Sequence, residues 1–320
     1  MKKNLLKYLA CPKCKNEIKI DAVEKKNGDE ILEGQLKCEC GCKFPIRSGL
    51  PIMLYDPAED IKKIQTVFSK EWDLFDYSDE DDTWLNLNEA KRIEMVMLAF
   101  NAKPEDLKGK VVLDAGCGNG RLSYNISKLG CEVVALDLSS GVVNASKRYK
   151  ENNLHYIQGN IMDIPLKKDS FDYIWSAGVL HHTPSTKKAF DNLVPLVKKD
   201  GILYVWVYGW PEGKRNIRSV LWWSGWRLIM IWPGFIKEIF CTLYVSYRVL
   251  KDALVLKKPI NELAVRQKRR SFYDNTNQYM YHHSPKEVES WYKEFNFKDI
   301  AVPIEEYKTF CGFGIRGVKQ

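Results

Sequence analysis

The stretch VVLDAGCGNGR, residues 111–121, decides the fold of this chain. Its first residues are apolar and β-branched, which predicts a short buried strand that ends near Asp114. Three glycines at alternate positions then allow a sharp turn and a close approach of the backbone to a ligand. Residues 122–129 follow with apolar side chains at helical spacing. A strand, a glycine-rich turn and a helix N-terminus form a nucleotide-type site in a parallel sheet, and a generic tight turn is the alternative.

The spacing of the glycines separates two kinds of ligand. A dinucleotide site requires Gly-x-Gly-x-x-Gly, and Arg121 occupies the position of the last glycine. The sequence instead has Gly-x-Gly-x-Gly directly after an acid, and residues 111–130 resemble the first motif of the class I S-adenosylmethionine (SAM) methyltransferases. That ligand has no phosphates, so the loop can pass close to its amino-acid part while Asp114 meets its ammonium group.

Alternating strands and helices follow this motif, which indicates a parallel sheet with helices on both faces. We therefore expect an α/β fold over residues 110–320. The resemblance implies the Rossmann-like class I methyltransferase fold, with a doubly wound, mainly parallel seven-stranded sheet. The segments 297–302 and 309–318 should form the last, antiparallel pair of strands.

Two further acids stand at the expected distances from the glycine loop. Asp137 ends the next predicted strand, where it is placed to bind two ribose hydroxyls or, alternatively, to cap a helix at Ser139. The family resemblance puts Asp163 at the adenine amino group and Met162 or Ile164 against the ring. The residues expected at the cofactor are Asp114, Gly116, Cys117, Gly118, Gly120, Asp137, Leu138, Asn160, Met162, Asp163, Ile164 and Ala177.

The loop after the fourth predicted strand carries two adjacent histidines, His181 and His182. The segment AGVLHHTP, residues 177–184, is similar to that of quinone-biosynthesis and related small-molecule methyltransferases of the type 11 family. It lacks the Asn/Asp-Pro-Pro-Tyr/Phe pattern of amino-group transfer to adenine, cytosine or glutamine, which speaks against those substrates. Either histidine can act as a general base, or both shape the pocket wall. Methyl transfer from a sulfonium depends more on in-line placement than on a base.

Cysteines are concentrated at the start of the chain, where five of the nine lie in the first 42 residues. No apolar signal segment is visible, so we expect a reducing cytoplasmic setting, in which clustered cysteines favour metal over disulfides. Cys11 and Cys14 form one knuckle, and Cys38, Cys40 and Cys42 supply the second half of the site. Together they predict an all-sulfur, tetrahedral, structural zinc site. A redox dithiol is the alternative for the Cys-Pro-Lys-Cys knuckle.

Residues 1–55 resemble a zinc-ribbon family that includes the small activator subunit of tRNA and protein methyltransferases. The likeness rests on residues 36–54, and above all on FPIRSGLP at residues 44–51. The second knuckle departs from the family because it reads Cys-x-Cys-x-Cys. Alignment with the family on Gly41 and Phe44 favours Cys40 as a ligand with Cys38 as the fourth, and leaves Cys42 as an alternative. Zinc would stabilise a module that has too little core to fold alone.

Residues 56–109 connect the ribbon to the main domain and are expected to form connector or lid helices. In similar fused methyltransferases an aromatic segment at this place folds over the SAM pocket, which makes Trp72 a candidate substrate contact. Alternatively, Trp72 and Phe75 pack on the surface of the domain. The acidic run at residues 79–82 is expected to be a solvated turn, and residues 88–100 are expected to form a helix.

A basic, aromatic insertion is expected at about residues 210–270. It holds five of the ten tryptophans and thirteen basic against four acidic residues, so the net charge of +8 is located here. Its apolar run at residues 220–235 is interrupted by Arg227 and Pro233, and is too short and broken to cross a membrane. Three interpretations remain open: a helical lid over the substrate pocket, an interfacial membrane helix, and a nucleic-acid surface.

Beyond the insertion, His282 and His283 are candidate substrate contacts, because similar enzymes bring this segment close to the active site. Ser284 is expected to cap the helix that follows.

The first functional hypothesis is a SAM-dependent methyltransferase that acts on a small-molecule or lipid- or glycan-linked acceptor. Such an enzyme would be cytoplasmic, with peripheral membrane contact through the insertion. The second hypothesis is an RNA or translation-protein methyltransferase, in which the ribbon and the insertion hold the macromolecule. The third is a non-catalytic SAM-binding partner subunit, and the intact cofactor residues weigh against it.

Overall fold

The computed structural model describes residues 1–74, 89–210, 225, 229, 232, 234–257, 259–275, 277–305 and 312–320. The predictions for Phe75, for the acidic run at 79–82 and for most of residues 220–233 lie outside these ranges. The described strands are β1 Ile18–Asn27, β2 Glu30–Cys38, β3 Lys43–Arg47, β4 Leu50–Met53, β5 Val111–Ala115, β6 Glu132–Asp137, β7 Leu154–Gly159, β8 Phe171–Ala177, β9 Val197–Tyr208, β10 Phe297–Glu305 and β11 Gly312–Lys319. The described α-helices are α1 Glu59–Leu74, α2 Glu89–Phe100, α3 Arg121–Ser127, α4 Gly141–Arg148, α5 Thr186–Leu193, α7 Gly234–Leu256, α8 Glu262–Asn275 and α9 Pro285–Glu294.

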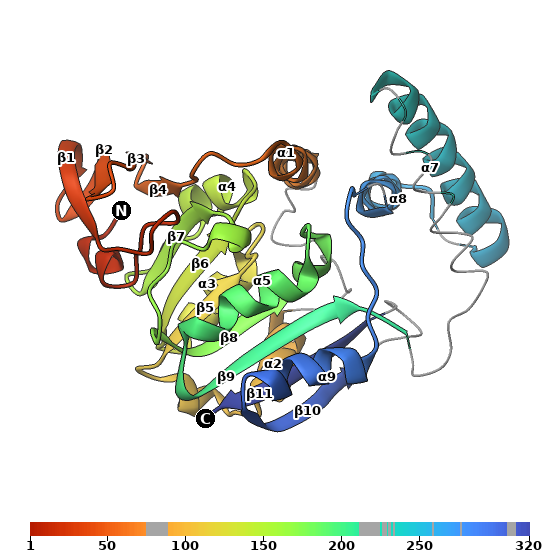
Figure 1. Cartoon of the computed structure of the whole chain (residues 1–320). Helices are drawn as coiled ribbons and strands as arrows, with labels where there is room; N and C mark the ends of the chain where they lie inside the picture. The colour runs from red at the N-terminus through yellow and green to blue at the C-terminus, as the bar shows by residue number, and fades with distance from the viewer. Residues whose placement is uncertain are drawn as a thin grey trace.

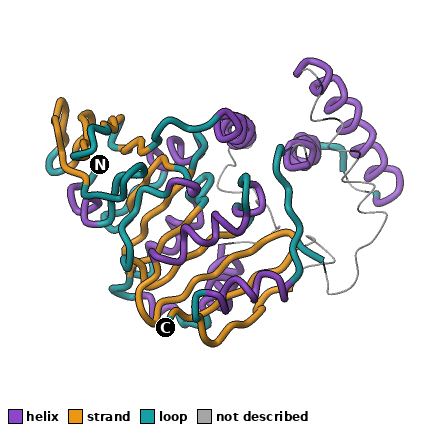
Figure 2. Tube along the Cα trace, viewed as in Figure 1, coloured by secondary structure: helices purple, strands orange, loops and turns teal. Residues whose placement is uncertain are grey.

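All described strands join one sheet, in the order β1-β2-β3-β4-β7-β6-β5-β8-β9-β11-β10 (Figures 1 and 2). Strands β5 to β11 form the predicted seven-stranded part. Its neighbours pair in parallel from β7 to β9, and only β11 runs antiparallel, to β9 on one side and β10 on the other. The expected fold class, a Rossmann-like methyltransferase fold, is thus confirmed.

Alternation along the strands divides the core into two layers. Val133 and Ala135 of β6 face a layer that includes side chains of α2, α3 and α4. Val134 and Leu136 face the opposite layer, with α5 and α9. Because successive strand residues point to opposite faces, a nearly continuous apolar run can bury both sides of the sheet. This packing fixes the carboxyl ends of β5, β6, β7 and β8 along one edge.

The N-terminal unit is joined to the sheet by its backbone. Strand β4 pairs in parallel with β7, with Ile52 opposite Gln158 and Met53 opposite Gly159. The 3₁₀ helix η1 (Lys3–Lys7) leads to Tyr8, whose ring stacks on Phe171 with 5.7 Å between centroids. Ribbon side chains therefore belong to the same buried cluster as those of β5 to β9.

Helices α7 and α8 pack on each other at the end of the molecule opposite the ribbon (Figure 1). Their shared core is small and consists of Cys241, Val245 and Val249 of α7 with Phe272 of α8. Through the part of the chain that the structure describes, no helix combines the length and hydropathy that a membrane crossing would require.

Candidate cofactor and active site

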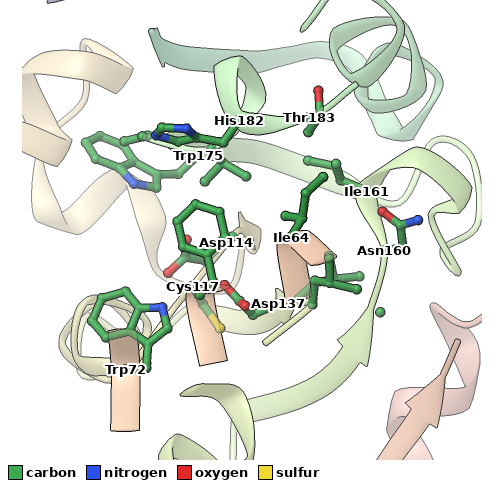
Figure 3. Close-up of a pocket in the computed structure, with 18 of the residues that line it drawn as sticks. Ile64, Trp72, Asp114, Cys117, Asp137, Asn160, Ile161, Trp175, His182 and Thr183 are labelled. Carbon is green, nitrogen blue, oxygen red and sulfur yellow. The ribbon is translucent and has the colours of Figure 1, made fainter. Parts of the chain in front are cut away.

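A cavity lies where the carboxyl ends of β5, β6, β7 and β8 meet, and side chains of helices α1 and α2 also line it. Figure 3 shows part of this lining. Ligands of doubly wound sheets bind at this edge, because the strand order reverses there and leaves a crevice. Eight of the twelve residues expected at the cofactor line the cavity: Asp114, Gly116, Cys117, Asp137, Leu138, Asn160, Met162 and Ala177. The other four, which are not part of its described lining, are Gly118, Gly120, Asp163 and Ile164.

Asp114 is almost fully buried at the end of β5, with 2% of its surface exposed. Burial raises the pKa of its carboxyl to about 7, the hydrogen bond from Ser123 lowers that pKa, and the charge of Asp137 raises it. The hydroxyl of Ser123 donates to Oδ2 of Asp114 at 2.5 Å. A buried carboxylate of this kind favours a cationic partner, because a positive charge compensates the cost of desolvation.

Asp137 ends β6 and ties the glycine loop to it. The backbone N–H of Gly118 donates to Oδ2 at 2.8 Å, while the N–H and hydroxyl of Ser139 donate to Oδ1 at 2.8 and 2.6 Å. The carboxylate thus forms an Asx-type turn, whereas the residue that caps α4 is Ser140. Asp137 also lines the cavity, so it can accept bonds from a ligand there.

Helix α1 packs over the glycine loop. Gly118 adopts φ +52°, and a Cβ built on it would lie 2.3 Å from Cζ2 of Trp72. The backbone N–H of Ser140 donates to the hydroxyl of Ser69, and Gln65 donates to the carbonyl of Leu138. Figure 3 shows Trp72 beside the cavity, on the side away from His182. The glycine at 118 is therefore needed for the indole to pack closely.

The turn after β7 places its predicted residues unequally. The side chain of Asn160 accepts from the N–H of Met162 at 3.0 Å, and both line the cavity. Asp163 is exposed, and its Oδ2 accepts from Asn160 at 3.4 Å. Ile164 is buried in the core on the ribbon side, at 3% exposure. Of the two residues expected against the adenine ring, Met162 is thus the one that faces the cavity.

The two histidines of the strand-β8 loop have different surroundings. His182 lines the cavity, and its Nδ1 donates to the carbonyl of Tyr279 at 2.9 Å, so a neutral ring carries its lone pair on Nε2. His181 is completely buried, and burial holds the pKa of its ring well below the usual range. Its Nδ1 accepts from the N–H of Tyr208 at 3.4 Å. His182 is therefore the histidine that can meet a substrate.

His282 and His283 contact Tyr208, the first through its ring and the second through its backbone N–H, and neither belongs to the described cavity lining. The ring of His282 stacks on Trp210 with 4.7 Å between centroids. His283 contacts Glu287 through Nδ1 at 2.9 Å and Thr186 through Nε2 at 3.0 Å. These contacts favour a role in fixing the segment after α8 rather than direct contact with a substrate.

Four cysteine sulfurs of the ribbon lie together. The Sγ atoms of Cys11, Cys14, Cys38 and Cys40 are all within 4.8 Å of one another. The Cys11–Cys40 pair is separated by 3.6 Å and the Cys14–Cys38 pair by 3.4 Å. A zinc ion with Zn–S bonds of about 2.3 Å requires sulfurs about 3.8 Å apart, so this set fits the ion. Cys42 is outside the cluster, which makes the alternative ligand assignment the poorer one.

Several residues of the cavity were missed at the sequence level. They come mainly from α1 and α2, which line it with Ile61, Ile64, Phe68, Glu71, Arg92 and Met95. Phe68 contacts the edge of His182, with 5.4 Å between ring centroids. For the apolar members the sequence signal was helical spacing, which does not tell a face toward a cavity from a face toward the core, and Glu71 and Arg92 had no such signal.

Comparison with known proteins agrees with this fold. Residues 113–205 match the family model described as "Methyltransferase domain". The ubiquinone biosynthesis O-methyltransferase of Coxiella burnetii is 32% identical over 139 residues, which are 41% of this chain and 59% of that protein. The malonyl-[acyl-carrier protein] O-methyltransferase of Enterobacter lignolyticus is 38% identical over 92 residues, 29% of this chain and 36% of that protein. The chain thus spans less than two thirds of the length of these relatives.

A solved structure extends the likeness of the fold. Magnesium protoporphyrin IX methyltransferase of Synechocystis PCC 6803, with bound SAH, superposes with a TM-score of 0.50 and 15% sequence identity. The superposition covers 82% of this chain and 100% of that chain. The likeness therefore reaches well beyond the segment matched by the family model.

Proposed function

We propose that the protein is a SAM-dependent methyltransferase acting on a small-molecule or lipid-linked acceptor. The observation that carries the proposal is the pair of carboxylates, Asp114 and Asp137, at the ends of adjacent strands beside a glycine loop. A buried acid suits an ammonium group, and a second acid suits neighbouring hydroxyls. The ubiquinone and malonyl-acyl-carrier relatives, both O-methyltransferases, support methyl transfer to oxygen.

The cavity residues fit the parts of SAM. Asp114 would bind the ammonium group, Asp137 the ribose, and Leu138 and Met162 would pack on the adenine ring. Trp72 and Phe68 line the cavity from α1 and would exclude water from that side of the bound cofactor. Bound SAM supplies an electrophilic methyl group on a sulfonium.

His182 would receive the acceptor's proton. The bond from its Nδ1 to the Tyr279 carbonyl orients the ring, which leaves Nε2 as the basic atom. The edge of Phe68 holds the ring from the α1 side. An acceptor hydroxyl between His182 and the methyl group would lose its proton as the new bond forms.

The ribbon cysteines would hold zinc in a closed structural site. The four thiolates leave no open ligand position, so the ion would stabilise the ribbon rather than take part in methyl transfer.

The test follows radiolabelled methyl transfer from SAM into small-molecule and lipid extracts, with wild type and His182→Ala. We expect His182→Ala to lower turnover at least a hundredfold and to leave SAM affinity within about threefold. His283→Ala is the matched control, because His283 lies outside the described cavity lining. Equal turnover in wild type and His182→Ala would remove the proposed base. Transfer only to RNA or to a ribosomal protein would replace the proposed acceptor.

A further inference from the structure

Helix α7 carries an exposed apolar face along most of its length. This face, here called the α7 face, comprises Phe235, Ile239, Leu243, Tyr247, Leu250 and Leu254, which are between 53% and 81% exposed. Spacings of three and four residues set these side chains in one row. The helix has 23 residues, so the row runs for about 30 Å.

The same helix buries a different row. Cys241, Val245 and Val249 pack against Phe272 of α8, and helical spacing sets them away from the α7 face. The packing of α7 on α8 therefore uses only one side of the helix. Six large apolar side chains remain exposed to solvent. They form one continuous row, whereas exposed apolar residues on soluble proteins are usually scattered singly.

Charge is distributed unequally around α7. Helical spacing places Lys251 next to Tyr247 and Leu254, at one edge of the α7 face. Lys237 and Arg248 are turned further toward α8, where the guanidinium of Arg248 donates to the hydroxyl of Tyr244 at 2.9 Å. The two acids of the helix are engaged elsewhere. Glu238 pairs with Lys70 of α1 and with Arg269 of α8 at 3.2 Å, and Asp252 pairs with Lys268 at 2.6 Å.

We infer that the α7 face binds a membrane surface that contains anionic lipids, with α7 lying parallel to it. An interfacial helix needs an apolar row that enters the acyl boundary and cations that reach the phosphate groups beside it. A second copy of the chain is the competing occupant, and its binding would appear as self-association.

The position of the α7 face suggests where an acceptor would enter. Glu238 joins α7 to Lys70 of α1, and α1 lines the cavity with Ile64 and Phe68. A membrane-bound α7 would therefore hold α1 and its side of the cavity near the lipid surface. This step rests on the proposed methyl transfer and identifies the acceptor class as an amphipathic lipid.

Flotation with vesicles tests the surface. Wild type should bind vesicles of phosphatidylcholine with phosphatidylglycerol, and phosphatidylcholine alone should bind it at least fivefold more weakly. Leu243→Glu should weaken binding about tenfold or more, because a leucine that would enter the acyl region of the membrane is replaced by a charge. Lys251→Ala should weaken it about fivefold. Leu98→Glu makes the same change at an exposed leucine of α2 and should bind as wild type does.

SAM affinity and sedimentation of each variant complete the test. SAM affinity should be the same in all four proteins, so a failure of SAM binding would count against the proposed function and not against the membrane surface. Absence of wild-type vesicle binding, or equal binding by Leu243→Glu, would overturn the inference. Self-association of wild type that Leu243→Glu abolishes would also overturn it, and would assign the α7 face to a second copy.

Discussion

The ribbon and the α7–α8 pair are both additions to one sheet, but they are attached to it differently. The ribbon continues the sheet through the β4–β7 pairing and shares its buried core. The α7–α8 pair has its own small core and reaches α1 through charged side chains such as Lys70 and Glu238. A unit joined by backbone and core should transmit its own stability to the cofactor site, whereas a unit joined by exposed ion pairs should not.

Loss of the zinc site should have the largest effect on SAM affinity. Strand β4 and Lys15, whose Nζ donates to the carbonyl of Ile164 at 2.8 Å, support the turn that carries Asn160 and Met162. A structural zinc site contributes roughly 10 kcal/mol, which is comparable with the whole net stability of a domain, so Cys14→Ser should unfold the ribbon. We expect SAM affinity to fall at least tenfold, measured by calorimetry together with zinc content. Cys42→Ser is the control and should keep both. Unchanged SAM affinity in zinc-free protein would contradict the claim that the ribbon supports the cofactor site.

Loss of the α1 contact with the glycine loop should have the next largest effect on SAM affinity. Trp72→Ala removes the indole that packs over Gly118, and we expect about tenfold weaker SAM binding because the site is less enclosed. Trp232→Ala is the matched control, since Trp232 contacts Phe240 of α7. Quenching of protein fluorescence by SAM gives both affinities. Equal losses of SAM affinity in the two variants would show that packing of the Trp72 indole over Gly118 does not specifically support SAM binding.

The pH dependence of SAM binding should follow Asp114. Burial raises the pKa of its carboxyl to about 7 in the cofactor-free protein, and a cationic ligand binds the deprotonated form. Affinity should therefore rise roughly fifteenfold from pH 5.5 to pH 7, and about twofold more before it levels off above pH 8. Asp114→Asn should bind weakly and lose this slope. A slope that survives in Asp114→Asn would assign the titration to another group.

The same shift has an opposite effect on folding. The folded-state pKa of Asp114 lies above the unfolded value, so the folded protein retains a proton that the unfolded chain loses between about pH 4 and pH 7. This group's contribution to stability is greatest at low pH and is lost as the pH rises through 7. The site thus keeps a carboxylate ready at neutral pH at some cost in stability.

The smallest effect is expected at the exposed pair between α1 and α7. Lys70→Ala removes one partner of Glu238, which keeps Arg269. Both side chains of the pair are more than a third exposed, so solvent screens the interaction to less than about 1 kcal/mol. SAM affinity and vesicle binding should each stay within about threefold of wild type at physiological salt. A larger loss would show that the α7–α8 pair controls α1 through this contact.

The sequence predicted the parts of the site that follow from backbone requirements. Gly116 has φ +96°, and Asp114 and Asp137 end two adjacent strands, so a local pattern carries the information. The sequence did not separate His181 from His182, because neighbouring loop residues differ in burial only through tertiary packing. Asp163 illustrates the same point, since the turn after β7 leaves it exposed while Asn160 faces the cavity.

The two additions were predictable to different degrees. The cysteine spacing indicated a metal site in the ribbon, because ligand geometry is local, and the family resemblance favoured the four sulfurs that lie together. The pairing of β4 with β7 was not predicted, because residues 52 and 158 are far apart in the chain and the sequence of a strand does not identify the strand with which it pairs. For the insertion, composition indicated basic and aromatic character, but the direction of the α7 face follows only from its packing on α8.

Titration of SAM into wild type, Asp137→Ala and Asp163→Ala tests the central claim most directly. The account predicts saturable binding by wild type, at least a hundredfold weaker binding by Asp137→Ala, and a change of less than about threefold in Asp163→Ala. Circular dichroism would check that each variant is folded. Absence of wild-type binding, or wild-type affinity in folded Asp137→Ala, would contradict the assignment of this cavity to SAM.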